Sequence, residues 1–288
     1  RALYGSKQGA RLWRKMLAEW LIAYGFVQCA FDECCYVWRT AAGIIILGVF
    51  VDDIMIAASN TDMKDRLVSD LCKKFKVDDR GTLKWALGML VTRDRKERTA
   101  TISCAARIEA MMERYCSAGA EHGKTYATPA DKSLADLSTT AVTKDQLKAS
   151  KRDAQVTETR GLLGALIFVA SVLRVDVAQA VFRVARHMAN PTEAVHSAAI
   201  RILLYLHKTK EMGLTYGGLA DSTMEGLARS VHVVVDASWE VGKSVSGYAM
   251  MMAGAAVHWS SRKQPITAIS SMDAETYAAS AAAADMLY

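Results

Sequence analysis

The sequence predicts an α+β fold, in which helical segments and strand-rich segments follow one another in blocks. Near the start, apolar residues recur at helical spacing in Arg11–Tyr24, and short apolar runs of strand length come next. The middle of the chain holds three longer segments with helical spacing, and its end returns to three strand-like runs before a last helix. With 288 residues, 51% apolar and 23% charged, the chain is long enough for two folded domains.

The first half is expected to contain a helix and then a β-hairpin. The helix over Arg11–Tyr24 ends at Gly25, and apolar runs on either side of Asp52-Asp53 predict two strands joined by an acidic bend. The other elements expected here are strands over Tyr36–Trp38, Ile44–Val51, Ile54–Ala58, Leu83–Thr92 and Thr99–Cys104, a helix over Met63–Phe75 capped by Thr61 or Asp62, and a helix over Ala105–Tyr115.

Composition changes in the second half. Residues 117–155 are polar, with few large aliphatic residues, so we expect a surface connection that is partly disordered. The elements expected after it are helices over Val156–Leu173, Val175–Ala189 and Thr192–His207, strands over Val231–Ala237, Gly247–Met252 and Ala256–Trp259, and a helix over Ser270–Tyr288 with Ser271 as its N-cap.

The bulk composition argues against a membrane or secreted protein. The longest apolar stretches, Ala41–Val51 and Gly161–Leu173, are shorter than the roughly 18–20 residues of a bilayer span, and no signal peptide precedes them. Six cysteines contain no C-x-x-C pair, which favours reduced intracellular thiols over a zinc site. The net charge of +6 is compatible with a polyanionic partner. An intracellular location, in a cytoplasmic particle or the nucleus, is therefore expected.

Two short motifs carry candidate chemistry. Phe50-Val51-Asp52-Asp53 places two carboxylates at the bend of the expected hairpin, and such hard oxygen ligands suit magnesium. Ala2–Trp13 (A-L-Y-G-S-K-Q-G-A-R-L-W) places glycines beside cations ahead of a helix, an arrangement that favours a phosphate. Taken separately, an ordinary polar turn explains the first motif better than a metal site does, and a basic loop entering an ordinary helix explains the second equally well.

Taken together, the motifs resemble the copia-type retrotransposon Pol polyprotein. That family has a segment much like A-L-Y-G-L-K-Q-A-P-R-x-W, then a Y-V-D-D hairpin, then L-x-x-F-L-G, which Leu83–Gly88 (L-K-W-A-L-G) resembles. Later stretches also match in order: Arg160–Leu166, Arg174–Ala178 (R-V-D-V-A), Pro191–Leu206, Asp236-Ala237-Ser238-Trp239, Ser246-Gly247-Tyr248, Trp259–Gln264 and Ser270–Tyr277.

The resemblance implies roles for the residues of the first half. Asp52 and Asp53 would be two of three palm carboxylates that bind catalytic Mg²⁺ or Mn²⁺, the third belonging to an upstream segment. The residues expected near the incoming nucleotide and template are Tyr4, Gly5, Lys7, Gln8 and Arg11. Those expected in the primer grip are Leu83, Lys84, Trp85, Leu87 and Gly88.

In the second half, the resemblance implies the start of a ribonuclease H. Asp236 and Glu275 match the first two of its four metal-binding carboxylates, and the other two would lie beyond Tyr288. A strand-end turn and a solvated helix face are the ordinary explanations for these two acids. Phe50, Ala10 and Val175 depart from the family pattern, which puts rate and stability in doubt more than fold.

The implied organisation has four parts. Residues 1–116 would be an N-terminally truncated reverse transcriptase palm and thumb, 117–155 a polar linker, 156–225 a helical connection, and 226–288 the N-terminal half of a ribonuclease H-like α/β domain. The chain opens at Arg1 in mid-pattern, so it is expected to be a fragment.

The parent would be an RNA-directed DNA polymerase, a nucleotidyltransferase with attached ribonuclease H, from an integrating element. Its partners would be an RNA template, a DNA primer, dNTPs, RNA–DNA hybrids and the remainder of the polyprotein. A non-catalytic relic that at most binds nucleic acid is the competing hypothesis, and an unrelated metal hydrolase is a third. The fragment alone is expected to be inactive.

Overall fold

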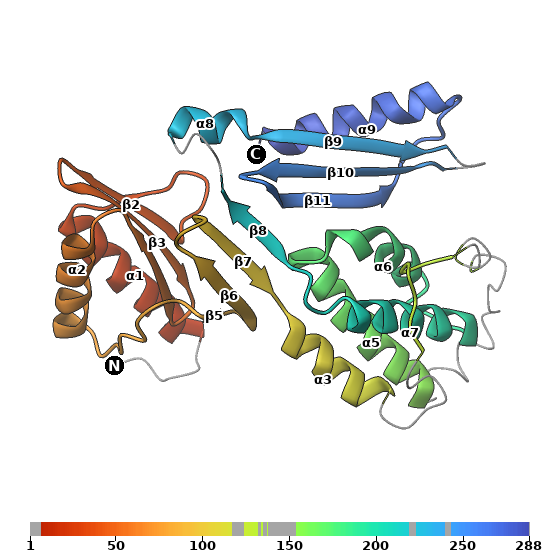
Figure 1. Cartoon of the computed structure of the whole chain (residues 1–288), viewed down its shortest axis with the longest axis horizontal. Helices are drawn as coiled ribbons and strands as arrows, with labels where there is room; N and C mark the ends of the chain where they lie inside the picture. Colours follow the sequence, from red (N-terminus) through yellow and green to blue (C-terminus); the bar gives the residue numbers. More distant parts are fainter. Residues whose placement is uncertain are drawn as a thin grey trace. The chain divides into compact units, whose positions relative to one another are not determined.

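A computed structural model of the chain describes residues 7–116, 124–131, 134, 137, 154–218, 223–239 and 243–287 (Figure 1). It divides into two compact units, 1–83 and 84–288. This division differs from the predicted boundary after residue 116, because strand β7 (Thr99–Ser103) pairs with β8 (Leu214–Gly217) from much later in the chain. Pairing over such a separation leaves no local signal in the sequence.

The first unit is an antiparallel sheet with two helices on one face. Its strands β1 (Val27–Gln28), β2 (Cys35–Thr40), β3 (Gly43–Phe50) and β4 (Asp53–Ala58) lie in sequential order. Alternate residues of β3 pack into a core with helices α1 (Lys7–Tyr24) and α2 (Thr61–Lys74). The buried members of this core are Leu17, Leu21, Phe26, Tyr36, Ile45, Leu47, Met63, Leu67, Leu71 and Phe75.

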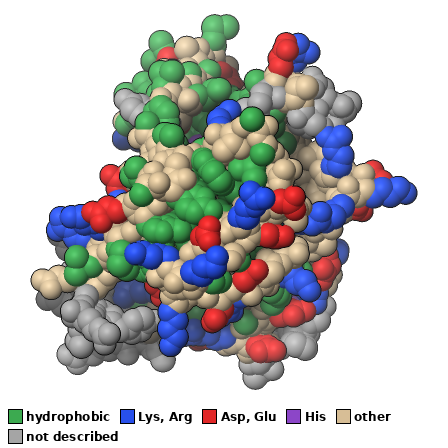
Figure 2. Space-filling view, turned by 90° about the vertical axis from the view of Figure 1, so that its left-hand side faces the viewer, with side chains coloured by type: hydrophobic (Ala, Val, Ile, Leu, Met, Phe, Trp, Pro, Cys, Tyr) green, Lys and Arg blue, Asp and Glu red, His purple; other side chains and the backbone are tan. Residues whose placement is uncertain are grey.

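The opposite face of this sheet carries apolar side chains that no described helix of the unit covers. Ile46 pairs with Val37 on one side and Ala57 on the other, so these three side chains lie on one face. Ile46 is 48% exposed and Phe50, on the same face, is 52% exposed. On the side of the molecule drawn in Figure 2, hydrophobic side chains reach the surface between charged ones.

The predicted cap of α2 was wrong by one or two residues. Asn60, not Thr61 or Asp62, is the N-cap, and its side chain accepts a hydrogen bond of 3.1 Å from the backbone N–H of Met63. All three residue types cap helices well, so propensity alone could not separate them.

The second unit begins with an antiparallel sheet of four strands, β5 (Trp85–Ala86), β6 (Met89–Asp94), β7 and β8. The single strand predicted over Leu83–Thr92 was wrong, since a two-residue turn divides it into β5 and β6. Leu87 and Gly88 both have positive φ, 54° and 78°, as the central residues of a type I′ hairpin turn do. Leucine rarely adopts this conformation, so its sequence signal was that of a strand.

Helices form the main core of the second unit. The helices α3 (Ala105–Cys116), α5 (Ala154–Val172), α6 (Ala178–Ala185) and α7 (Glu193–Lys208) pack together around buried aliphatic residues. Leu134 and Leu137 are buried in the same core, at 6% and 5% exposure, so the segment 117–155 is not purely a surface connection. Most of that segment lies outside the described residues, so its predicted partial disorder stays a prediction.

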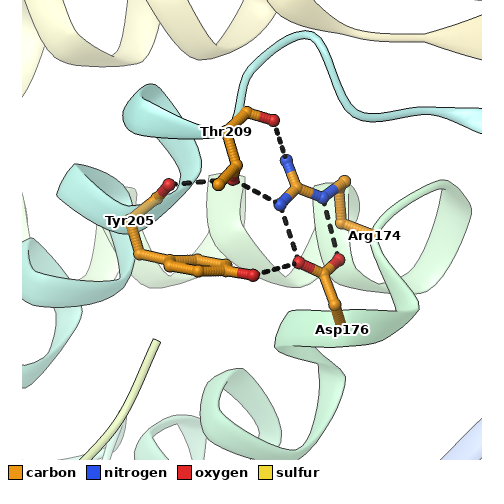
Figure 3. A network of polar contacts seen from close by, with 4 residues as sticks. All are labelled: Arg174, Asp176, Tyr205 and Thr209. Atoms are coloured by element: carbon orange, nitrogen blue, oxygen red, sulfur yellow. Dashed lines mark hydrogen bonds and ion pairs between the residues drawn. The ribbon is translucent and has the colours of Figure 1, made fainter. Parts of the chain in front are cut away.

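A polar network around the buried Arg174 joins the connection between α5 and α6 to the end of α7 (Figure 3). Arg174, only 1% exposed, makes two hydrogen bonds to the carboxylate of Asp176, at 2.8 and 2.7 Å. It also donates to the backbone carbonyl and the hydroxyl of Thr209 at the end of α7, and the Tyr205 hydroxyl donates to Asp176. The predicted helix over Val175–Ala189 was wrong at both ends, since a short 3-10 helix, η2 (Val175–Val177), precedes α6 and α6 ends at Ala185. Asp176, which accepts the hydrogen bonds of Arg174, lies in η2.

The last part of the second unit is a three-stranded antiparallel sheet with one long helix. Strand β10 (Val245–Met252) lies between β9 (His232–Ser238) and β11 (Ala255–Lys263), and α9 (Ser271–Met286) runs along them (Figure 1). A short helix, α8 (Met224–Arg229), precedes β9. The N-cap of α9 is Ser270, not Ser271 as predicted. No helix in the described part of the chain is both long and apolar enough to cross a membrane.

Candidate functional site

The predicted acidic hairpin is present in the first unit. Phe50 pairs with Asp53 across the ladder, so Val51 and Asp52 form a two-residue turn between β3 and β4. Val51 has φ of 53°, the conformation of the first central residue in a type II′ turn, where glycine is usual. A β-branched residue in this conformation is strained, and such strain persists only where the surrounding structure imposes it.

Both carboxylates at this tip are exposed. Asp52 lies in the turn and Asp53 is the first residue of β4. The described part of the chain provides neither side chain with an ion pair or a hydrogen bond. Two adjacent, unpaired carboxylates on a rigid turn fit Mg²⁺, which proteins commonly bind through one or two carboxylates together with substrate phosphates.

Helix α1 is attached to this tip. The indole Nε1 of Trp13 donates a hydrogen bond of 3.1 Å to the backbone carbonyl of Val51. The Trp13 ring also contacts Phe75 edge to face, with the ring centroids 5.3 Å apart. The sequence placed Trp13 in a motif but did not predict this contact, which joins the two motifs in space. The one signal in the sequence that could have suggested this contact is the position of Trp13 at the end of the opening motif.

The structure describes some of the residues that were predicted to bind the nucleotide. Gln8 and Arg11 lie in the first turns of α1 and are exposed. Lys7 begins α1, but its side chain, like Tyr4 and Gly5 altogether, lies outside the described residues. The structure therefore brings the first turns of α1 and the acidic tip into one unit, tied through Trp13.

The predicted primer-grip residues are all exposed. Leu83 is the last residue of the first unit, and the others form the β5–β6 hairpin of the second. Trp85 is 56% exposed and Leu87 39% exposed, which is high for large apolar side chains. An exposed aromatic ring at a hairpin is available for stacking on a base.

The two predicted ribonuclease H carboxylates lie in the last sheet and its helix. Tyr248 of β10 pairs with Val235 of β9 and donates its hydroxyl to Asp285 of α9, so this face of the sheet is the one that α9 covers. Asp236 follows Val235 and points to the other face, while Glu275 is exposed in the first turns of α9. The described residues do not join the two carboxylates in a contact.

No three acidic, histidine or cysteine side chains cluster closely enough to hold a metal ion by themselves within the described ranges. The acidic tip therefore offers two protein ligands, and a metal there would need further ligands from substrate or from another segment.

Comparison with known proteins identifies the family. The model of the reverse transcriptase (RNA-dependent DNA polymerase) family matches residues 1–129, which include α1 and the acidic hairpin. The whole chain is 29% identical to the retrovirus-related Pol polyprotein from transposon TNT 1-94 of Nicotiana tabacum. Residues 1–129 thus match the reverse transcriptase family, and the chain is similar over its whole length to a retrotransposon Pol polyprotein.

Other relatives show the same similarity. Identity is 29% to the Pol polyprotein from transposon RE1 of Arabidopsis thaliana, over 96% of the chain. It is 28% to the transposon Ty5-1 protein of Saccharomyces cerevisiae, covering 96% of the chain and 85% of that relative. The chain spans about a fifth of the length of the two plant polyproteins, 21% and 18%. No solved structure matches it.

Proposed function

We propose that this chain is part of a copia-type RNA-directed DNA polymerase with an attached ribonuclease H, and that the tip of the β3–β4 hairpin belongs to the polymerase active site. The observation that carries the proposal is the pair of exposed carboxylates at a strained two-residue turn, to which the described residues provide no ion pair or hydrogen bond and which Trp13 fixes to the motif-bearing helix. Strained turns of this kind occur preferentially at functional sites.

Asp52 and Asp53 are the proposed metal ligands. A bound Mg²⁺ or Mn²⁺ would help to activate the primer 3′-hydroxyl and to stabilise the departing pyrophosphate. The chain's own contribution is positioning: β3 and β4 hold both carboxylates at one end of the sheet, and the Trp13 hydrogen bond fixes the turn between them. The third carboxylate of this family's palm is assigned to a segment that precedes Ala2 in the parent polyprotein.

Cations on α1 support a polyanionic substrate next to this tip. Arg11 is exposed near the start of the helix, and no acidic residue lies in its first turn. We assign Arg11 and Gln8, with Tyr4, Gly5 and Lys7 ahead of them, to the dNTP and the RNA template. Leu83, Lys84, Trp85, Leu87 and Gly88 are assigned to the primer grip, where the exposed Trp85 ring would lie against the primer end.

The second proposed activity is hydrolysis of the RNA strand of an RNA–DNA hybrid. Three consecutive antiparallel strands followed by a helix support the start of a ribonuclease H-like domain. Asp236 and Glu275 are the proposed ligands for its metal ions, and two further carboxylates of the parent would complete the site. Asp236 points away from the sheet face that α9 covers, whereas Glu275 is part of α9. A metal ion held by both carboxylates would therefore have to lie outside the edge strand β9, where the two faces meet.

A non-catalytic relic is the second candidate. The departures at Phe50 and Val175 from the family pattern favour it. The exposed cations of α1 would still bind nucleic acid weakly and without sequence preference.

Primer extension on poly(rA)–oligo(dT) with Mg²⁺ or Mn²⁺ tests the polymerase proposal. We expect no incorporation by this chain alone and measurable incorporation when it is joined to the palm segment that precedes it in its parent reading frame. Asp52→Asn with Asp53→Asn should reduce incorporation by the joined protein about 100-fold or more, because both protein ligands of the metal are lost.

The matched control is a second adjacent pair in the same unit, Asp78→Asn with Asp79→Asn, which should leave incorporation unchanged. A folded but inactive joined protein would favour the relic. Activity that survives the change at positions 52 and 53 would refute the assignment of these two carboxylates. Incorporation by the chain alone, lost on the same change, would show that the expected inactivity was wrong.

A further inference from the structure

The loop between β1 and β2 brings two cysteines opposite each other. The β1–β2 ladder pairs Val27 with Val37 and Gln28 with Tyr36, and the same register continued by one residue places Cys29 opposite Cys35. The backbone confirms this continuation, because the N–H of Cys29 donates a hydrogen bond of 2.8 Å to the carbonyl of Cys35. Directly opposed residues on antiparallel strands have their side chains on the same face.

The spacing of such a pair suits a disulfide. Cα atoms of directly opposed residues on antiparallel strands are about 4.5–5.5 Å apart, and disulfides join Cα atoms about 4.4–6.8 Å apart. None of the six cysteines, all of which lie in the described part of the chain, forms a disulfide in the structure. Burial is the largest influence that raises the pKa of the Cys35 thiol, and the Cys29 thiol is the next, so the two groups interact.

Both thiols lie on the sheet face that the described helices of this unit leave open. Cys35 pairs with Gly48 of β3, on the same face as Val37 and Ile46. Cys29 and Cys35 are both half-buried, so a small oxidant can reach them. We infer that Cys29 and Cys35 are a redox modification site, at which a low-molecular-weight disulfide such as glutathione disulfide forms a reversible cross-strand bridge.

The exchange is balanced without any other reactant. The thiolate of one cysteine attacks the small disulfide, forms a mixed disulfide and releases one small thiol. The thiolate of the other cysteine then attacks the protein sulfur of that mixed disulfide and releases the second small thiol. The protein loses two protons and two electrons, and the small disulfide is reduced to two thiols.

The bridge would close a loop that contacts both elements of the proposed polymerase site. Glu33 in this loop forms an ion pair with Arg14 of α1. The carbonyl of Cys34 accepts a hydrogen bond of 2.9 Å from the N–H of Val49 in β3. Oxidation would therefore stiffen the edge of the sheet beside α1, whereas reduction would leave the loop held by non-covalent contacts alone.

Incubation of the reduced chain with glutathione disulfide, acid quenching, alkylation and peptide mapping test the inference. Cleavage after Glu33 separates Cys29 from Cys34 and Cys35. We expect these two peptides to be linked, the link to disappear on addition of dithiothreitol, and exposed Cys72 on α2 to carry at most glutathione. The closed loop should raise the melting temperature of the first unit by about 5–10 °C.

Serine variants decide which cysteines are joined. The link should persist in Cys34→Ser and Cys72→Ser and be absent from Cys35→Ser, with circular dichroism confirming that each variant is folded. A link that is lost in Cys34→Ser, or a folded wild-type chain that carries only mixed disulfides, would overturn the inference. None of these outcomes depends on polymerase activity.

Discussion

Replacing Arg174 with alanine is expected to destabilise the second unit by about 2–4 kcal/mol, since it removes a buried side chain and leaves the partly exposed carboxylate of Asp176 without its partner. The guanidinium is 1% exposed and makes two hydrogen bonds to Asp176 and two to Thr209 (Figure 3). Alanine would also leave the carbonyl and hydroxyl of Thr209 short of donors. Urea unfolding, followed by circular dichroism of the helices, measures the loss.

The control for this change is an exposed ion pair of the same unit. Arg229 and Glu225 are 70% and 74% exposed, so Arg229→Ala should change stability by no more than about 0.5 kcal/mol. A loss below about 1 kcal/mol for Arg174→Ala would show that the network is not an important support of the helical core.

The stability that this network provides is expected to fall at acidic pH. Burial is the largest influence on the pKa of Asp176 and raises it, but the hydrogen bond and charge of Arg174, with the Tyr205 hydroxyl, more than offset burial and lower the pKa overall. A carboxyl whose pKa is lowered by folding stabilises the protein above its unfolded pKa of about 3.9. That contribution is lost as the pH falls through the folded pKa, so Asp176→Asn should flatten the acid limb of the stability curve.

Replacing Trp13 with alanine should destabilise the first unit by about 2–3 kcal/mol. The ring is partly buried against Phe75, and its Nε1 holds the carbonyl of Val51 at the acidic turn. Trp13→Phe keeps an aromatic ring and loses the hydrogen bond, so about 1 kcal/mol is expected. Hydrogen exchange of the β3 and β4 amides measures both losses, and these amides should exchange faster in both variants.

The neighbouring Leu12 is the matched control for Trp13. It is 54% exposed on the same helix, and Leu12→Ala should change stability by no more than about 0.5 kcal/mol. Equal effects of the two alanine variants would mean that Trp13 stabilises only the helix and does not fix the hairpin.

The spacing of apolar residues was sufficient to predict the helices and strands that have strong local sequence patterns. The strands around Asp52-Asp53 were predicted to within one residue, because apolar runs on both sides of a two-residue acidic break have few other solutions. The turn is Val51-Asp52, not Asp52-Asp53, since Asp53 pairs with Phe50 and begins β4. Helix α1 was predicted to end at Tyr24, as the structure has it, since Gly25 adopts a positive φ of 114° that other residues avoid.

The errors fell where distant contacts or unusual conformations decide the structure. Leu87 adopts a positive φ that its type does not favour, so the β5–β6 turn was missed. Leu134 and Leu137 are too sparse to predict a core segment, and only the helices against which they pack show that they are buried. The strand β8 is four residues long and pairs with β7 from far away in the chain, so its local pattern predicted nothing.

The candidate site was predictable from the family resemblance more than from residue patterns. Two adjacent aspartates alone suggest an ordinary turn, and the structure adds what the sequence could not: the strain at Val51 and the Trp13 hydrogen bond. The quartet around Arg174 was missed as a unit, because its members are separated by up to 35 residues and only the fold brings them together.

Paramagnetic broadening by Mn²⁺ of amide resonances of the 288-residue chain tests the central claim most directly, because it detects even weak metal binding at a known position. We expect residues 50–54 to broaden first, the effect to vanish in the Asp52→Asn, Asp53→Asn variant and to persist in the Asp78→Asn, Asp79→Asn control. Broadening that begins elsewhere, or that is unchanged when both hairpin carboxylates are removed, would contradict the assignment of this turn as a metal-binding part of a polymerase site.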